Sequence, residues 1–123
     1  MYKYTLSELQ HKAKTLSSIV IAPHVIILEG DLGAGKTTFA QYFLKSILVN
    51  AEQTIISPTF TLVNVYNTTK GIVWHADLYR LRNEAELFEL GLIEFAHNGI
   101  TLIEWADYIL PYINKVPKTV ISL

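Results

Sequence analysis

The segment from residue 30 to residue 37 reads Gly30-Asp31-Leu32-Gly33-Ala34-Gly35-Lys36-Thr37. It satisfies the pattern G-x-x-x-x-G-K-[ST], in which backbone N–H groups and a lysine surround phosphate groups. The apolar, largely β-branched run 25–28 precedes it and predicts a strand buried on both faces. Apolar side chains then recur at helical spacing over 36–50, which predicts an amphipathic helix. Strand, glycine-rich loop and helix together predict a loop that binds a nucleoside triphosphate.

Each part of this loop has a chemical task. The glycines let backbone N–H groups turn inward, and the helix N-terminus adds partial positive charge. We expect Lys36 to neutralise the β- and γ-phosphates. We expect the Thr37 hydroxyl to be a ligand of Mg²⁺, because a hard cation prefers oxygen. Thr38 completes the predicted nucleotide-binding set of residues 30–38.

The base is predicted to be adenine rather than guanine. Guanine-specific GTPases carry an N-K-x-D loop, and the nearest match, Asn114-Lys115-Val116-Pro117, has proline in place of the aspartate. A D-x-x-G motif also fails, because Asp77-Leu78-Tyr79-Arg80 has no glycine. The expected cofactors are therefore ATP and Mg²⁺.

The rest of the chain predicts an α/β fold. Thr5 with Glu8 three residues later forms a capping-box pattern that begins a helix over 6–18. The remaining predicted elements are a strand at 61–66, a strand at 71–77 antiparallel to it, a helix at 84–90, and strands at 100–103 and 119–123. This order predicts one domain over 1–123, with a mixed, mainly parallel sheet between helices in the three-layer arrangement of P-loop NTPases.

Acidic side chains follow two of the predicted strands. Glu104 ends the apolar run 100–103, where phosphate-loop NTPases place a second acidic group that holds Mg²⁺ or polarises water. Asp107 is the competing carboxylate. His75 and Asp77 are two residues apart on a strand and therefore share a face. Asp77 could bind Mg²⁺ or position water, and His75 could orient that group or form a hydrogen bond with a phosphate. A solvated hairpin face is the alternative.

Other polar residues have weaker assignments. Thr59, in the loop Ser57-Pro58-Thr59, could sense the γ-phosphate, and an ordinary turn is the alternative. Arg80 and Arg82, the only arginines, could pair with phosphate oxygens or act as an arginine finger, although an exposed arginine is the commoner case. The aromatic residues Trp105 and Tyr108 are left unassigned.

Composition excludes several classes of protein. With 10 basic and 11 acidic residues and no basic stripe, the chain alone is not expected to bind nucleic acid tightly. The absence of cysteine excludes disulfides and thiolate metal sites. No apolar segment reaches the length of about 18 residues that spans a membrane, so a soluble, cytoplasmic protein is expected. Because half of the residues are apolar, we also expect an exposed apolar patch of the kind that binds partners.

Several segments taken together resemble one known family. They are GDLGAGKTTF (30–39), SPTFTLVNVY (57–66), HADLYRL (75–81), ELGLIEF (89–95) and LIEW (102–105). In this order and spacing they resemble the bacterial TsaE (formerly YjeE) ATPases, subunits of the machinery that makes threonylcarbamoyladenosine in transfer RNA. The phosphate loop is common to many families, whereas SPTF with HADLYR and LIEW is far more specific.

The resemblance implies roles for individual residues. Lys36 and Thr37 match the family's phosphate and Mg²⁺ residues, and Thr59 matches a switch-like loop. Asp77 matches a position important for ATP hydrolysis, and Glu104 matches the acidic group at the metal. Catalytic roles are thus expected for Glu104, Asp77 and Lys36, and metal binding for Thr37 and Glu104.

The resemblance also implies partner proteins. The subunit TsaD, held with TsaB, catalyses the transfer, and the TsaE-like subunit binds and slowly hydrolyses ATP at their interface. From the residues alone, a nucleotide-gated binding module and a small P-loop phosphotransferase remain open as alternatives. Family members usually continue with further strands and a basic segment, so we expect this chain, naturally short or truncated, to lack the family's C-terminal strands after Leu123.

Overall fold

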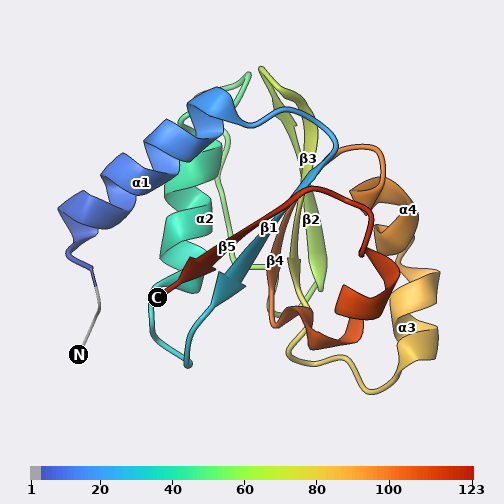
Figure 1. The fold of residues 1–123 in the computed structure, drawn as a ribbon. Coiled ribbons are helices and arrows are strands. Elements are labelled where there is room, and N and C mark those ends of the chain that lie inside the picture. Colours follow the sequence, from blue (N-terminus) through green and yellow to red (C-terminus); the bar gives the residue numbers. More distant parts are fainter. Residues whose placement is uncertain (1–3) are drawn as a thin grey trace.

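A single sheet forms the centre of the computed structural model, which describes residues 4–123 (Figure 1). Its strands in chain order are β1 (His24–Glu29), β2 (Val63–Thr68), β3 (Gly71–Asp77), β4 (Ile100–Glu104) and β5 (Lys118–Ser122). In space the order is β2-β3-β4-β1-β5. Only the β2–β3 hairpin is antiparallel among these neighbours, and the other three pairs are parallel. The prediction of a mixed, mainly parallel sheet is confirmed.

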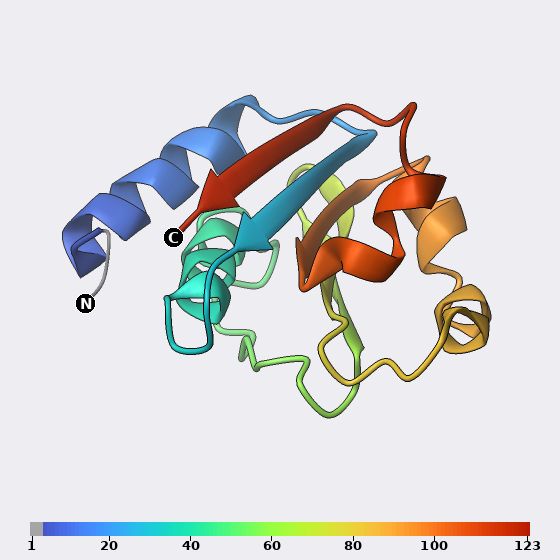
Figure 2. The same cartoon turned by 60° about the horizontal axis from the view of Figure 1, so that its bottom comes forward.

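Helices cover both faces of the sheet. The α-helices are α1 (Leu6–Ile19), α2 (Lys36–Lys45), α3 (Glu84–Glu89) and α4 (Leu92–Ala96), and short 3₁₀ turns η1 (Ala106–Tyr108) and η2 (Leu110–Tyr112) follow β4. Helices α1 and α2 lie on one side and α3 and α4 on the other, as both views show (Figures 1 and 2). In the part of the chain that the structure describes, no helix has the length and apolar character needed to cross the bilayer.

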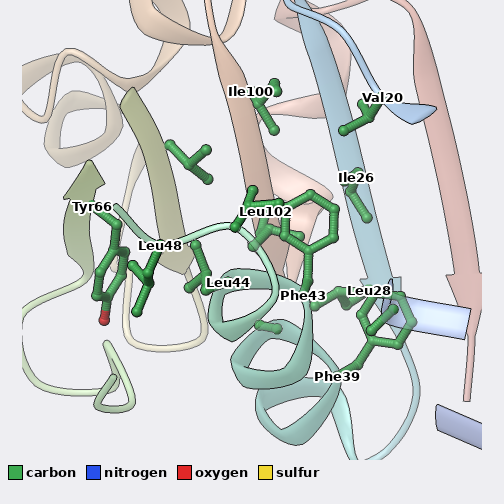
Figure 3. Close-up of a cluster of buried hydrophobic side chains, with 14 of the residues drawn as sticks. Val20, Ile26, Leu28, Phe39, Phe43, Leu44, Leu48, Tyr66, Ile100 and Leu102 are labelled. Carbon is green, nitrogen blue, oxygen red and sulfur yellow. The ribbon is translucent and has the colours of Figure 1, made fainter. Parts of the chain in front are cut away.

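The core consists of two apolar clusters separated by the sheet. Strand β1 contributes to both, because successive side chains point to opposite faces. Ile26 and Leu28 join the cluster under α1 and α2, which also contains Phe39 and Phe43 (Figure 3). Val25 and Ile27 join the cluster under α3 and α4. This two-sided burial explains why residues 25–28 form an uninterrupted apolar run.

The first predicted helix is confirmed, and its start is stabilised locally. The Thr5 hydroxyl accepts a hydrogen bond from the Glu8 N–H at 3.1 Å, and Glu8 accepts one from the Thr5 N–H at 2.9 Å. These bonds satisfy N–H groups that a helix start otherwise leaves unpaired.

The predicted extent of the second helix is wrong: α2 ends at Lys45, not at residue 50. Residues 47–49 turn toward the β2–β3 hairpin, where Leu48 forms a bridge with Thr68 and the Val49 N–H donates to the Asn67 carbonyl at 3.1 Å. Leu48 is buried there, so its apolar character reflects the core rather than a continuing helix.

Two other boundaries differ from the prediction. Strand β2 runs two residues later than 61–66, since it begins after Leu62, whose φ of 68° breaks the extended backbone. Helix α4 was not predicted. Gly91, expected only to end the preceding helix, has φ 72° and also begins α4. Gly91 therefore separates two helices, α3 and α4, whereas the sequence predicted only that it ends the first.

Candidate nucleotide-binding site

The carboxyl ends of three adjacent parallel strands meet at the phosphate loop. Loop 30–35 connects the end of β1 to the start of α2. Strand β4 lies beside β1 and ends at Glu104. Strand β3 is next and ends at Asp77, which pairs with Glu104 in the register. The strand order assumed for Glu104 is therefore correct, and both carboxylates lie next to the loop as expected for a sheet of this kind.

The loop has the backbone conformation that its glycines predict. Gly30, Gly33 and Gly35 have φ values of 148°, 80° and 104°. The Lys36 ammonium donates a hydrogen bond to the Gly30 carbonyl and lies 3.6 Å from the centre of the Trp105 ring. Burial lowers the pKa of Lys36, whereas the charges of Glu104, Asp77 and Asp31 act in the opposite direction. The cation is thus held by a carbonyl dipole and an aromatic face.

Thr37, Glu104 and His75 form a continuous chain of hydrogen bonds. The Thr37 hydroxyl lies 3.0 Å from both Glu104 carboxylate oxygens, to which it donates. The His75 Nε2 lies 2.7 Å from Oε2 of the same carboxylate. Glu104 is only 2% exposed and His75 is fully buried. The predicted metal ligands Thr37 and Glu104 are therefore in direct contact.

Asp77 lies beside this chain with partners of its own. Its Oδ1 accepts from the Tyr79 N–H at 3.1 Å, and its Oδ2 accepts from the Thr59 hydroxyl at 3.4 Å. Burial is the main cause of a raised pKa for Asp77, and the Glu104 charge adds to it, while the hydrogen bonds from the Tyr79 N–H and the Thr59 hydroxyl oppose the shift. The structure thus connects the Thr59 loop to the acidic end of β3.

These side chains line a cavity of about 560 Å³. The predicted residues on its wall are Leu32, Gly33, Gly35, Lys36, Thr37, Thr38, Thr59, Asp77 and Glu104. Trp105, unassigned from sequence, also lines it, together with Leu6 and Leu9 in the first turn of α1 and Tyr4 and Thr5 just before it. The capping box predicted this helix, but no local pattern indicates that its first turn lies over the loop. Gly30, Asp31 and Ala34 belong to the loop without lining the cavity.

A family model described as "Threonylcarbamoyl adenosine biosynthesis protein TsaE" matches residues 4–123. The chain belongs to the TsaE family. The curated TsaE proteins of Rickettsia bellii and Bacillus subtilis are 39% and 41% identical to it over 102 and 98 residues, which cover 83% and 79% of this chain. The crystal structure of Bacillus subtilis YdiB superimposes with a TM-score of 0.67 at 34% identity, covering 98% of this chain and 73% of that one.

Membership of the TsaE family supports a role in tRNA threonylcarbamoyladenosine biosynthesis. The matched region is 70% of the Rickettsia bellii relative and 60% of the Bacillus subtilis relative. The family motifs contribute to the site in different ways. On the cavity wall, HADLYRL supplies Asp77, LIEW supplies Glu104 and Trp105, and SPTF supplies Thr59. HADLYRL also supplies His75, which contacts Glu104 from behind the wall.

Some candidates are not brought to the main cavity. Asp107, the competing carboxylate, lines a separate, smaller cavity of about 140 Å³, whose wall also includes Trp105. The Arg80 guanidinium lies 5.2 Å from the centre of the exposed Phe60 ring. Neither arginine lines the cavity, and Arg82 is exposed. Within residues 4–123, therefore, Lys36 is the basic side chain on the cavity wall.

The donor atoms at the site suit Mg²⁺ better than a soft metal. Across the described residues there is no group of three or more His, Cys, Asp or Glu side chains arranged to hold a metal ion. Oxygen donors are present in the Thr37 hydroxyl and the Glu104 and Asp77 carboxylates. Mg²⁺ in nucleotide sites usually takes one or two protein ligands, with phosphate and water oxygens completing its shell. The residues therefore fit this ion.

Proposed function

We propose that this chain binds Mg-ATP and hydrolyses it slowly as the ATPase subunit that acts with TsaD and TsaB in threonylcarbamoyladenosine modification of tRNA. The observation that carries the proposal is the meeting of Lys36, Thr37, Asp77 and Glu104 at one end of three adjacent strands. Family membership supports the pathway, and the loop with its acidic neighbours supports the chemistry.

The residues divide the chemistry between them. The backbone N–H groups of loop 30–37 and the Lys36 ammonium bind the phosphates. Thr37 and Glu104, with Asp77 beside them, would hold Mg²⁺, which supplies positive charge to the transferring phosphoryl group. Asp77 or Glu104 polarises the attacking water. Neither Arg80 nor Arg82 is among the described residues that line the cavity, which is consistent with slow hydrolysis by the chain alone.

The Thr59 loop would report the nucleotide state to a partner. The Thr59 hydroxyl lies 3.4 Å from Asp77 Oδ2, to which it donates, and 2.7 Å from Ser57 Oγ within the same loop, so Thr59 connects the loop to the acidic end of β3. Phe60, the next residue, is 86% exposed, and Tyr79, two residues after Asp77, is also exposed. Such exposed aromatic side chains are typical of partner surfaces. A loop that differs between ATP and ADP states would couple hydrolysis to partner binding.

The test is ATP binding and hydrolysis by the purified chain, alone and with TsaB and TsaD, together with co-elution of the three proteins. Lys36→Ala should abolish ATP binding and modification activity. Lys45→Ala, an exposed lysine at the end of the same helix, is the matched control and should change neither. Full activity of Lys36→Ala would refute the proposal. ATP-dependent co-elution without hydrolysis would favour a nucleotide-gated binding module instead.

A further inference from the structure

His75 lies behind the site rather than in it. It is on β3, two residues before Asp77, and it is fully buried. Its register partner on β4 is Leu102, and Val73 precedes it on the same face. Both of these neighbours belong to the apolar core cluster under α1 and α2. Thr37, Asp77 and Glu104 line the cavity, but His75 does not. It can therefore affect bound nucleotide only through another side chain.

The polar contacts of His75 identify that side chain as Glu104. Nε2 lies 2.7 Å from Glu104 Oε2, and the other ring nitrogen, Nδ1, is buried with no hydrogen-bond partner among the described residues. A carboxylate only accepts hydrogen bonds, so Nε2 must carry the proton that it donates. In this neutral tautomer Nδ1 keeps only a lone pair, and no buried N–H group is left unpaired. The local environment thus selects one tautomer.

This bond fixes the direction of the Glu104 carboxylate. Oε2 accepts from His75 on one side and from the Thr37 hydroxyl on the other, at 2.7 Å and 3.0 Å. Without His75, the Glu104 side chain would keep only the Thr37 hydroxyl as a partner among the hydrogen bonds found. Partners behind a ligating group commonly set its orientation, and their loss costs about 10- to 100-fold in metal affinity or activity.

We infer that His75 is a positioning residue that donates through Nε2 to Glu104 and holds this carboxylate beside Thr37 for Mg²⁺. The inference rests on the proposed function and adds a residue to it. It distinguishes His75 from Asp77, its neighbour on the same face: Asp77 contacts the cavity, whereas His75 acts from the core.

Two substitutions of His75 distinguish a role in positioning Glu104 from a role in packing the core. His75→Leu fills the space with an apolar side chain and removes the donor. His75→Gln keeps an N–H donor at similar reach. Thr101→Val is the matched control, because Thr101 on neighbouring β4 is also fully buried and its hydroxyl has no partner among the described residues. It tests the effect of altering a buried polar residue of the sheet that lies away from Glu104.

Binding of a fluorescent ATP analogue is measured while Mg²⁺ is titrated, which gives the Mg²⁺ concentration at which the increase in binding is half complete. Binding of the same analogue without Mg²⁺ and thermal unfolding are measured alongside. His75→Leu should raise the half-saturating Mg²⁺ concentration about 10- to 100-fold while binding without Mg²⁺ stays within about twofold. His75→Gln should recover most of the Mg²⁺ response, and Thr101→Val should keep all of it. An unchanged Mg²⁺ response in His75→Leu would overturn the inference.

A second comparison keeps the test decisive if His75→Leu does not fold. His75→Asn has a shorter side chain that withdraws the donor from Glu104, so it should behave as His75→Leu is expected to. In a Glu104→Ala background, His75→Asn should cause no further loss of Mg²⁺ response, and an added loss would overturn the inference. Failure of the proposed function is distinguishable, because Lys36→Ala would then still bind ATP.

Discussion

Alanine substitutions at Gly30 and Gly33 test whether the phosphate loop is built as the structure shows. Both residues have positive φ, 148° and 80°, which costs an alanine about 1–3 kcal/mol. Alanine also lowers the entropy of the unfolded chain, which returns about 0.4–1 kcal/mol in both cases. To first order these contributions cancel when the two variants are compared.

The surroundings of the two glycines differ. A Cβ at Gly30 would lie 2.9 Å from the Ala34 Cβ and 3.2 Å from the Leu123 carbonyl oxygen, whereas a Cβ at Gly33 would meet nothing within 4 Å. Overpacking of this kind costs about 1–3 kcal/mol. Gly30→Ala should therefore unfold with a free energy at least about 1–3 kcal/mol lower than Gly33→Ala. For a chain of this size, each kcal/mol corresponds to about 3–6 °C in Tm.

For ATP affinity the order of the two variants should be reversed: relative to its loss of stability, Gly33→Ala should lose more affinity than Gly30→Ala. Gly33 lines the cavity, and Gly30 does not. Gly33→Ala should thus lose ATP affinity out of proportion to its loss of stability. Urea unfolding and isothermal titration of ATP on the same preparations measure both quantities. The reasoning would be refuted if Gly33→Ala were destabilised as much as Gly30→Ala, because only Gly30 has close neighbours.

Three further predictions concern the carboxylates and the core. Glu104→Ala and Asp77→Ala should each lower the rate of ATP hydrolysis by about 10²–10⁴-fold with a smaller effect on ATP binding, and poor binding with a normal rate at saturation would contradict the assigned roles. Because the pKa of Asp77 is raised in the folded state, mainly by burial, its ionisation destabilises the fold as pH rises through that pKa. Asp77→Asn should therefore be more stable than the wild type at pH 7, and urea titrations should show the difference vanishing at acidic pH; a constant difference would exclude this cause. Phe43→Ala, at a fully buried position, should lower the free energy of unfolding by about 3–5 kcal/mol, and Phe60→Ala, 86% exposed, by less than about 0.5, while equal effects would contradict the core assignment.

Local sequence determined the phosphate loop and most of the secondary structure. The glycines at 30, 33 and 35 permit the positive φ values that the loop adopts. Together with Lys36 and Thr37 they predict phosphate binding from residue types alone. The Thr5–Glu8 capping box and the two-sided apolar run 25–28 depend on near neighbours in the chain, so they too could be identified before the structure.

Tertiary pairing decided the boundaries that sequence predicted incorrectly. Residues 47–49 leave the helix because Leu48 and Val49 pair with the β2–β3 hairpin, about twenty residues further along the chain. Their apolar spacing was compatible with either outcome. Gly91 was equally ambiguous, since positive φ both ends one helix and begins the next.

Strand order likewise decided which side chains meet at the site. Glu104 and Asp77 are recognisable as acids at strand ends, but their place on the wall of the same cavity as the loop follows from β4 lying between β3 and β1. The contacts of His75 with Glu104 and of Trp105 with Lys36 join residues 29 and 69 positions apart, measured from 75 to 104 and from 36 to 105. Local periodicity reports only which face a side chain occupies; the parallel register determines which side chain it meets there.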